Sequence, residues 1–487
     1  MEAAAAAAAK RAHGSAPDRL SALSDELLCQ VLSFLPSRQA VQTTMLSRRW
    51  MDLWRSVPAI RISSRDFGGG TWMGVHWKRK MLDFANNLLM LNNARCLDTF
   101  RLDFPCTAPD RPDLCCDAAR WVRHGIKCQP LVLQILVDRS HWFVYHFQIP
   151  RLGSELRRLK RLEFQSVVLD SCFSERLSSG CPVLEVLVLR SCANDFAAIQ
   201  SDTLKNLVVH TCASGGVDRL VVRAPCLASM SLDFISMSRR YKNGLSLEAG
   251  NSLVTASISV DPKQFSPRTE AILLSSVFNV KSLELQLFQA MAIMDKELDN
   301  FTIFENLRTL SLNRCFLSKR DAAKFKALGR FLRKSPNLEK LILKDFWYSE
   351  ATVRERLDNP RLEMVKPVVG PIEFPILENL RTLVLDKCDL RDKFRLLRHL
   401  LRSSPNLEKL IVQRCELPGP GVSMGQKGKA KLKKTHSGLQ NLVHFQCSKL
   451  KYTEIIYEKG VKIQELVGFL LDISGSATEN SITLTKV

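Results

Sequence analysis

Two stretches of the chain are near copies of one another: Glu305–Cys315 reads ENLRTLSLNRC and Glu378–Cys388 reads ENLRTLVLDKC. A segment with helical apolar spacing follows each of them, over Phe325–Leu332 and Phe394–Leu401, and leads to KSPNLEKLIL or SSPNLEKLIV. The shared pattern LxxLxL puts alternate side chains on one face of a short strand. We therefore expect a duplicated unit in which a helix follows each strand.

The same pattern recurs along most of the 487-residue chain. It starts at Leu97, Leu159, Leu184, Leu204, Leu227, Val280, Leu307, Leu338, Leu380 and Leu407. From Leu159 onward, most successive starts are separated by the roughly 20 to 29 residues of a leucine-rich repeat. One repeat cannot bury its own apolar face, so neighbouring repeats must stack. The sequence predicts an α/β fold with a leucine-rich-repeat solenoid (horseshoe) over residues 151–445, with strands on its concave side and helices outside.

Two longer intervals in this pattern leave room for insertions. Asn359–Pro375 is rich in proline, and Pro418–Ser437 is rich in glycine and lysine. Both are expected to be exposed loops. The densest lysine run of the chain, QKGKAKLKK, lies in the second loop.

The segment Asp18–Pro58, DRLSALSDELLCQVLSFLPSRQAVQTTMLSRRWMDLWRSVP, predicts three short helices. Ser24 is suited to cap the first, which Pro36 stops, while Ser37 and Ser47 can cap the second and third. A unit of this size cannot bury all of its leucine and tryptophan side chains by itself. Part of its apolar surface is therefore expected to dock on a partner.

This segment resembles the plant F-box in its LxxLxDELL opening at Leu20–Leu28, its SFLP at Ser33–Pro36 and its LSRRWxxLW at Leu46–Trp54. One departure is Leu23-Ser24, where the family usually has Leu-Pro. The resemblance implies binding to a Skp-type adaptor and, through it, to the cullin and RING subunits of a ubiquitin ligase. The side chains expected to bind the adaptor are Leu23, Leu27, Leu28, Leu32, Leu35, Pro36, Leu46, Trp50 and Trp54.

The last part of the chain, NLVHFQCSKLKYTEIIYEKGVKIQELVGFLLDIS from Asn441 onward, resembles the FBD-type segment that ends plant F-box proteins. We expect a strand near Tyr452–Ile456 and a closing helix whose apolar stripe comprises Val461, Leu466, Phe469 and Leu470. The whole chain is similar to plant F-box/leucine-rich-repeat proteins of the F-box/FBD type. The expected parts are a disordered Ala-rich tail (1–16), the F-box (17–60), a connecting region with atypical first repeats (61–150), the repeat array (151–445) and an FBD-like cap (446–487).

The composition narrows the classes of partner. The net charge of +21 permits nucleic acid, an anionic membrane or acidic proteins, but the basic residues are dispersed along the chain, which disfavours nucleic acid. No apolar run is long enough to span a membrane, and the alanine-rich start lacks the features of a secretion signal. We expect the protein in the cytoplasm and/or nucleus, where its fifteen cysteines stay reduced.

The sequence predicts no catalytic residues, cofactor or metal. Five cysteines, each just after a predicted strand, are expected to be structural: Cys192, Cys212, Cys315, Cys388 and Cys415. Cys115, Cys116, His124 and Cys128 are residue types that bind zinc, but they lack paired CxxC spacing, so packing is the preferred interpretation. Catalytic motifs such as GxSxG, the Walker sequence and HExxH do not occur. We therefore expect a protein that is not an enzyme.

The predicted function is that of the substrate-recognition subunit of a Skp-cullin-F-box E3 ubiquitin ligase, in which the repeat hollow captures a protein target. Apolar and basic side chains alternate there, which suits an acidic peptide with apolar anchors. The expected contacts are Arg190, His210, Lys340, Ile342, Lys344, Val384, Lys409, Ile411 and Gln413. Two alternatives remain open: a receptor for a small anion or hormone in the hollow, and an adaptor-independent scaffold that binds nucleic acid.

Overall fold

The computed structural model describes residues 20, 22–68, 76–105, 113–138, 147–148, 156–214, 220–234, 245–249, 251–263, 265–289, 303–316, 321–346, 374–391, 393–417, 445–458, 463–474 and 481–486. The predicted tail 1–16, the insertion Pro418–Ser437 and nearly all of Asn359–Pro375 lie outside these ranges. The chain divides into two compact units, Met1–Ala193 and Asn194–Val487. The short strand β8 (Ala193–Asn194) lies where the sequence passes from one unit to the next.

The first unit begins with the F-box helices. They are α2 (Asp25–Ser33), α3 (Ser37–Gln42) and the 3₁₀ helices η1 (Thr43–Met45), η2 (Arg48–Trp50) and η3 (Leu53–Ser56). Ser24 caps α2 as predicted, since its hydroxyl accepts a hydrogen bond from the Leu27 amide at 3.4 Å. The other two predicted caps are wrong. The Ser37 hydroxyl accepts from the Arg61 amide at 2.8 Å, and the Ser47 side chain makes no capping bond.

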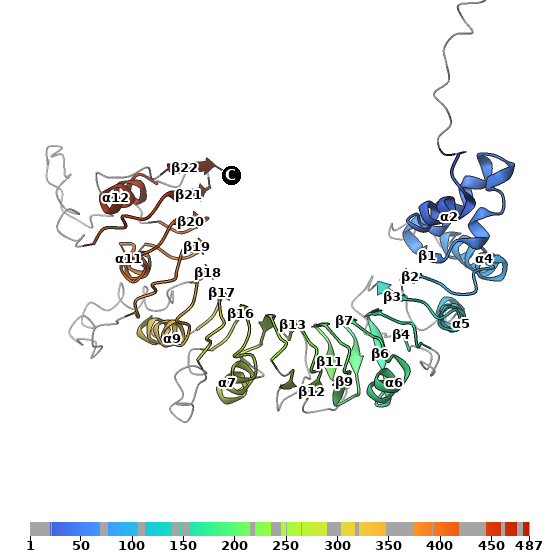
Figure 1. Ribbon diagram of the computed structural model, residues 1–487, viewed down its shortest axis with the longest axis horizontal. Coiled ribbons are helices and arrows are strands. Elements are labelled where there is room, and N and C mark those ends of the chain that lie inside the picture. The colour runs from blue at the N-terminus through green and yellow to red at the C-terminus, as the bar shows by residue number, and fades with distance from the viewer. Residues whose placement is uncertain are drawn as a thin grey trace, which may run out of the picture. The chain divides into compact units, whose positions relative to one another are not determined.

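A β-sheet and three further α-helices complete the first unit. Its elements are β1 (Ala59–Ser63), η4 (Ser64–Phe67), α4 (His76–Leu91), β2 (Thr99–Pro105), α5 (Asp113–Lys127), β3 (Val132–Asp138), β4 (Phe147–Gln148), β5 (Arg161–Gln165), β6 (Val167–Leu169), α6 (Phe173–Gly180) and β7 (Val186–Arg190). The strands β1, β2, β3, β5 and β7 pair in this order, all parallel. Helices α4, α5 and α6 cover one face of this sheet; the other, which we call the open face, carries none of these three helices (Figure 1).

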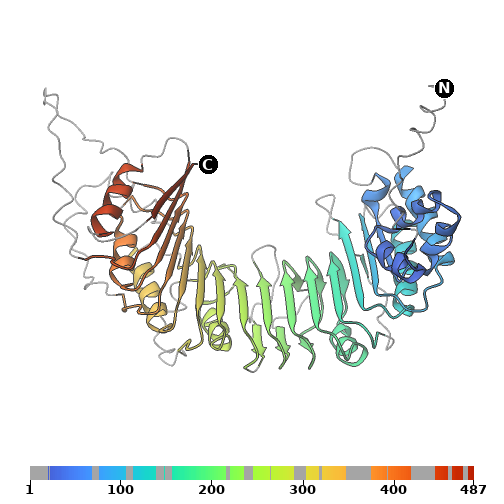
Figure 2. The same ribbon diagram turned by 45° about the horizontal axis from the view of Figure 1, so that its top comes forward.

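The second unit repeats the same arrangement. Its elements are β9 (Ala198–Gln200), β10 (Asn206–His210), β11 (Ala213–Ser214), β12 (Leu220–Arg223), β13 (Ser229–Asp233), β14 (Leu245–Glu248), β15 (Thr255–Ser259), α7 (Pro267–Ser276), β16 (Ser282–Gln286), β17 (Thr309–Asn313), α9 (Asp321–Arg333), β18 (Lys340–Lys344), β19 (Thr382–Asp386), α11 (Arg395–Arg402), β20 (Lys409–Gln413), β21 (Tyr452–Tyr457), α12 (Gln464–Ser474) and β22 (Ser481–Lys486). Strands β10, β13 and β15 to β22 form a parallel sheet in chain order. Helices α7, α9, α11 and α12 lie on one side of it (Figure 2).

The alternation predicted for the repeats is confirmed by burial. In β17 and β18 the leucines at the second and fourth positions, Leu310, Leu312, Leu341 and Leu343, are at most 1% exposed. Neighbouring strands pair position for position, so these leucines form continuous rows under the sheet. The prediction of short N-terminal helices followed by α/β repeats is confirmed. The helices of the described residues include none that is long and apolar enough to cross a membrane.

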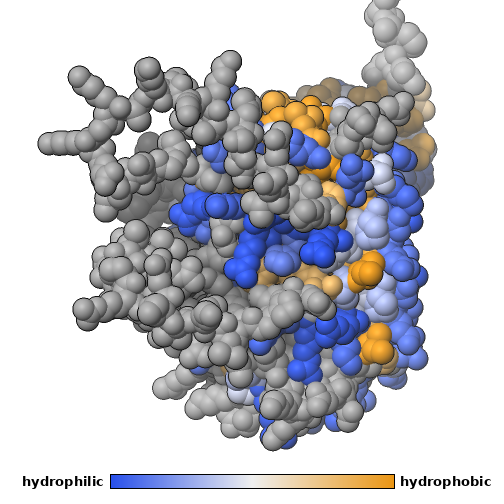
Figure 3. All heavy atoms as spheres, turned by 90° about the vertical axis from the view of Figure 1, so that its left-hand side faces the viewer, coloured by the Kyte–Doolittle hydropathy of each residue, from blue (hydrophilic) through white to orange (hydrophobic). Residues whose placement is uncertain are grey.

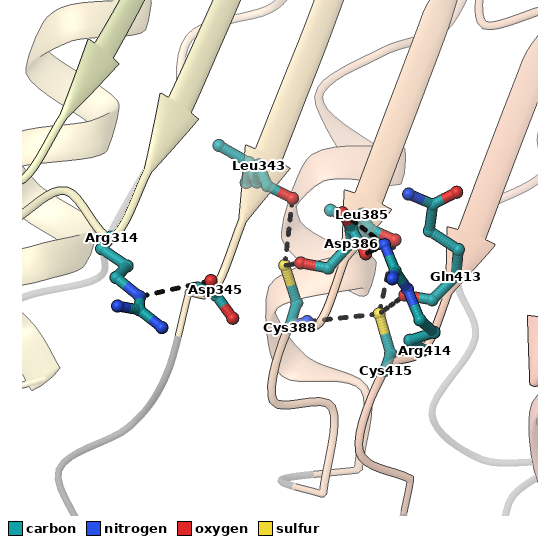
Figure 4. A network of polar contacts seen from close by, with 9 residues as sticks. All are labelled: Arg314, Leu343, Asp345, Leu385, Asp386, Cys388, Gln413, Arg414 and Cys415. Carbon is teal, nitrogen blue, oxygen red and sulfur yellow. Dashed lines mark hydrogen bonds and ion pairs between the residues drawn. The ribbon is translucent and has the colours of Figure 1, made fainter. Parts of the chain in front are cut away.

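The same turn ends the strands of the duplicated repeats. Arg314, Lys387 and Arg414 have left-handed φ angles of 49°, 52° and 50°. This conformation is unfavourable for non-glycine residues, but the Lys387 amide gains a hydrogen bond of 2.9 Å to the carbonyl that ends the next strand, at Gln413. The cysteine after each of these residues is buried, and Figure 4 shows the Cys388 and Cys415 thiols pointing at the Leu343 and Leu385 carbonyls, at 3.3 and 3.4 Å. The predicted structural role of these cysteines is thus confirmed.

Candidate protein-binding surfaces

The F-box has a closed core of its own. Leu28, Leu32, Ala40, Trp50, Leu53, Val57 and Ala59 pack together, and each is at most 9% exposed. Four predicted adaptor contacts, Leu28, Leu32, Trp50 and Trp54, are therefore at most 8% exposed in the folded chain. These four side chains have a structural role in the core of the folded chain, and their prediction as adaptor contacts is corrected accordingly. The Trp54 indole also donates to the Met51 carbonyl at 3.0 Å, which fixes it within the fold.

The remaining predicted contacts lie nearer the surface. Leu23, Leu35 and Pro36 are partly exposed, whereas Leu27 and Leu46 are 46% and 66% exposed. Leu27 and Val31 of α2, and Phe34 just after it, follow one another at helical spacing on a different face from Leu28 and Leu32. Phe34 is 80% exposed and Met45 88%. Exposed apolar side chains gathered in this way mark a docking surface.

We call this set of exposed F-box side chains the F-box surface; it comprises Leu20, Leu27, Val31, Phe34, Met45, Leu46 and Met51. Five of its members were missed in the sequence. The available signal was that α2 carries two apolar stripes, only one of which a small unit can bury. At the surface of the F-box, Arg49 pairs with Asp25 at 2.7 Å and also donates to the Leu23 carbonyl, so it ties η2 to the start of α2.

Seven of the nine predicted target contacts come together on three adjacent strands of the second unit. In β18, β19 and β20, Ile342, Val384 and Ile411 are register partners and form one row on the open face. Each is only partly buried. We call them, together with Lys340, Lys344, Lys409 and Gln413, the β18–β20 patch. Figure 3, which faces the C-terminal end of the chain, shows hydrophobic groups set among hydrophilic residues on the described surface.

Charge is distributed unevenly around this patch. The register row Thr309, Lys340, Thr382, Lys409 and Tyr452 contains two lysines and no acid. The Lys409 ammonium lies 4.7 Å from the centre of the Tyr452 ring. In the opposite row, Lys344 is 3.5 Å from Glu284, which lies in the same register row as Ile342. Arg414 holds Asp386 of that opposite row at 2.9 Å (Figure 4). The acid-free row is therefore the positive border of the patch.

The other two predicted target contacts lie elsewhere. His210 in β10 is hydrogen-bonded to the Ser231 hydroxyl at 2.8 Å, five strands away from β18 in the sheet order. Arg190 belongs to the first unit, where it forms an ion pair with Glu163. Burial raises the pKa of Glu163, but hydrogen bonds from Gln134, Arg161 and Arg190 outweigh it and lower the pKa overall. Both residues are thus engaged in contacts within the sheet.

The possible zinc ligands do not assemble a site. Cys115 and Cys128 are partly buried, whereas Cys116 is exposed. Burial, together with the charge of Lys127, lowers the pKa of His124. Within the described residues, no group of three or more histidine, cysteine or acidic side chains is placed to hold a metal ion.

Comparison with known proteins agrees with this geometry. Residues 20–61 match the family model of the F-box domain, and residues 127–252 match that of the FBD-associated F-box protein At5g56370, LRR repeats. The MEIOTIC F-BOX protein MOF of Oryza sativa subsp. japonica is 30% identical over 350 residues, which cover 67% of this chain and 71% of that protein. This chain belongs to the plant F-box/leucine-rich-repeat proteins of the F-box/FBD type.

Similarity to further F-box/FBD proteins extends over most of the chain. The F-box/FBD/LRR-repeat protein At1g78750 of Arabidopsis thaliana is 27% identical over 439 residues, which cover 82% of this chain and 91% of that protein. F-box proteins generally act in Skp-cullin-F-box ubiquitin ligase complexes, where the F-box binds a Skp1-type adaptor. F-box/leucine-rich-repeat proteins are typically non-enzymatic adaptors, and neither matching family model describes an enzyme.

Proposed function

We propose that this F-box/FBD protein is the substrate-recognition subunit of a Skp-cullin-F-box E3 ubiquitin ligase. The observation that carries the proposal is the F-box surface: large apolar side chains stay exposed although the F-box core beneath them is closed. A Skp-type adaptor would cover this surface and connect the chain to the cullin and RING subunits. The chain would act by proximity, because tethering raises the effective concentration of target lysines near the conjugating enzyme.

We further propose that the repeats in each unit stack as a solenoid whose open strand face captures a protein target. The β18–β20 patch is the part of that face which best suits an acidic peptide with apolar anchors. Ile342, Val384 and Ile411 offer an apolar row, and Lys340 and Lys409 line its acid-free border. We propose that the protein acts in the cytoplasm and/or nucleus, where a chain with many free cysteines keeps its thiols reduced.

The adaptor proposal is tested by co-expression with a plant Skp-type adaptor and size-exclusion chromatography. The parent chain should form a one-to-one complex, whereas Leu27→Asp with Val31→Asp should not, because two charges would be buried in an apolar interface. Both side chains are about half exposed in the free chain, so the fold should survive. Ile272→Asp, on the equally exposed face of α7, is the matched control and should bind like the parent. A parent that is folded but ignores the adaptor contradicts the proposal.

The target proposal is tested with Ile342→Asp and Ile411→Asp in the full chain. These variants should lose the proteins that co-purify with the parent from plant extract, as measured by quantitative mass spectrometry, while still binding the adaptor. Val254→Asp, also an exposed apolar residue of the second unit, should retain them. Unchanged capture by the patch variants would show that the target binds elsewhere.

A further inference from the structure

Two arginines face each other on the open side of the first unit's sheet. Arg61 of β1 and Arg101 of β2 are register partners on parallel strands. Their neighbours Ile60, Ile62, Phe100 and Leu102 are at most 1% exposed and point to the helix-covered face, so both arginines point to the open one. Adjacent strands are about 4.8 Å apart. Like charges directly opposite each other at this spacing are destabilising unless a counter-charge lies between them.

No carboxylate supplies that counter-charge within the described part of the chain. Neither Arg61 nor Arg101 forms an ion pair there, and the acid nearest in the register, Asp103 of the next row, accepts a hydrogen bond from the Ser63 hydroxyl at 3.2 Å. Along their own row, Gln134 follows, but its amide donates to Glu163 at 2.7 Å. Glu163 is itself held by Arg161 and Arg190. Among the described residues, no carboxylate therefore neutralises the guanidinium groups of Arg61 and Arg101.

The electrostatics of the pair agree with its geometry. The Nη1 atom of Arg61 is shielded from solvent and has no hydrogen-bond partner. Burial, and then the charge of Arg101, lowers the pKa of Arg61. A buried donor without an acceptor costs about 1–3 kcal/mol in general. Both side chains are nevertheless partly exposed, so a small ion can reach them from solvent.

We propose that Arg61 and Arg101 form a binding site for the phosphate group of a small molecule. Guanidinium groups present paired N–H donors that match phosphate oxygens. A phosphate monoester carries a charge of about −1.5 to −2 near neutral pH, which balances two guanidinium groups, whereas a carboxylate balances only one. The site lies where β1 leaves the F-box, since Ala59 packs in the F-box core and the Arg61 amide is bonded to Ser37. Bound phosphate would stabilise this junction.

The experiment measures binding of inorganic phosphate, glycerol 3-phosphate and acetate to the full chain by isothermal titration calorimetry, with thermal unfolding in parallel. Inorganic phosphate or glycerol 3-phosphate should bind and raise the melting temperature with the logarithm of its concentration; which of the two binds better identifies the free ion or the monoester as ligand. Acetate should have little effect. Arg61→Gln or Arg101→Gln should weaken phosphate binding about tenfold or more.

Matched variants separate this site from general effects of salt and of misfolding. Arg223→Gln removes a guanidinium that pairs with Glu248 in the second unit, and it should bind phosphate like the parent. Arg101→Lys keeps the charge but loses the paired donors, so it should retain weakened binding. Without phosphate, Arg101→Gln should melt no lower than the parent, because it relieves repulsion. The proposal is overturned if no phosphate compound binds the parent, or if the gain in melting temperature persists unchanged in Arg101→Gln.

Discussion

Glu270 is a single residue whose ionisation is set by its surroundings. It lies in α7 with no exposed surface. There it accepts a hydrogen bond from the backbone N–H of Gln289 at 2.8 Å and another from the side-chain amide of Gln289 at 2.9 Å. Burial raises its pKa to about 7, against the lowering effect of these two bonds. Sequence reasoning did not single out Glu270, since an acid in the first turn of a helix is ordinarily exposed there.

Glu270→Gln should remove a pH dependence of stability. Between its ordinary pKa of 4.5 and about 7, the folded chain holds a proton that the unfolded chain has lost. Stability of the parent should therefore fall as pH rises through this window, by up to about 3 kcal/mol. Urea unfolding at pH 5 and pH 8 measures this fall in the free energy of unfolding. The difference between the two pH values should be smaller for Glu270→Gln than for the parent. The exposed Glu305→Gln should behave like the parent, and an equal pH difference in Glu270→Gln would contradict the assignment.

The residue types alone do not show which of two neighbouring leucines in the F-box is buried. Leu27 and Leu28 are adjacent in the same motif, yet one is 46% exposed and the other fully buried. Helical spacing showed that they lie on different faces, but only packing against Trp50 and Leu53 reveals which face is inside.

Two helical glycines, Gly125 and Gly468, differ in how closely their surroundings pack against them. Gly125 lies in α5, and a Cβ atom built there would come within 2.6 Å of the ring of Phe100, a fully buried residue of β2. Gly468 lies in α12, where a Cβ would meet nothing within 4 Å. Both glycines are therefore helical, but Gly125 has no room for a side chain, whereas Gly468 has open space beside it.

Alanine substitutions at these glycines should have opposite effects. Helix propensity alone favours alanine over glycine by about 1 kcal/mol, which Gly468→Ala should gain. Gly125→Ala should instead destabilise the chain, because forcing an extra carbon into a packed core costs typically about 1–3 kcal/mol and the buried Phe100 ring has little room to move. Urea unfolding of both variants checks this, and a stabilised Gly125→Ala would show that α5 can shift away from β2.

In the molecule as a whole, the two proposed protein-binding surfaces belong to different compact units. The F-box surface lies in Met1–Ala193 and the β18–β20 patch in Asn194–Val487. A receptor that works by tethering needs both surfaces at once, but it requires no communication between them.

Adaptor binding and target capture should therefore be separable by substitution. Leu27→Asp with Val31→Asp should abolish adaptor binding and leave target capture intact, and Ile342→Asp with Ile411→Asp should do the reverse. Only the parent should bring adaptor and target into one complex, measured by sequential affinity purification. Loss of both activities from either pair of substitutions would contradict independent surfaces.

The sequence by itself determined the features that depend on local period. The LxxLxL pattern predicted a short strand in each repeat, and β17, β18, β19 and β20 lie at four of the predicted places, because alternation is a local property. It also indicated the structural cysteines, since the same position recurs after each strand. The strand and helix expected near the C-terminus are present as β21 and α12, although Val461 of the predicted stripe lies outside the described residues. The strand β22 was not anticipated, because its residues bury little apolar surface.

Tertiary structure decided everything that depends on which residues meet across the sheet. Register pairing brings Arg61 beside Arg101, forty positions later, and aligns Ile342 with Val384 across the insertion between β18 and β19. It also surrounds Glu163 with Gln134 and Arg190, and it engages Arg190 and His210 in contacts within the sheet. The repeat pattern predicted that Ile342, Val384 and Ile411 line one face, but no spacing in the sequence encodes the contacts of Arg61, Glu163, Arg190 or His210, because they arise only when strands distant along the chain lie side by side.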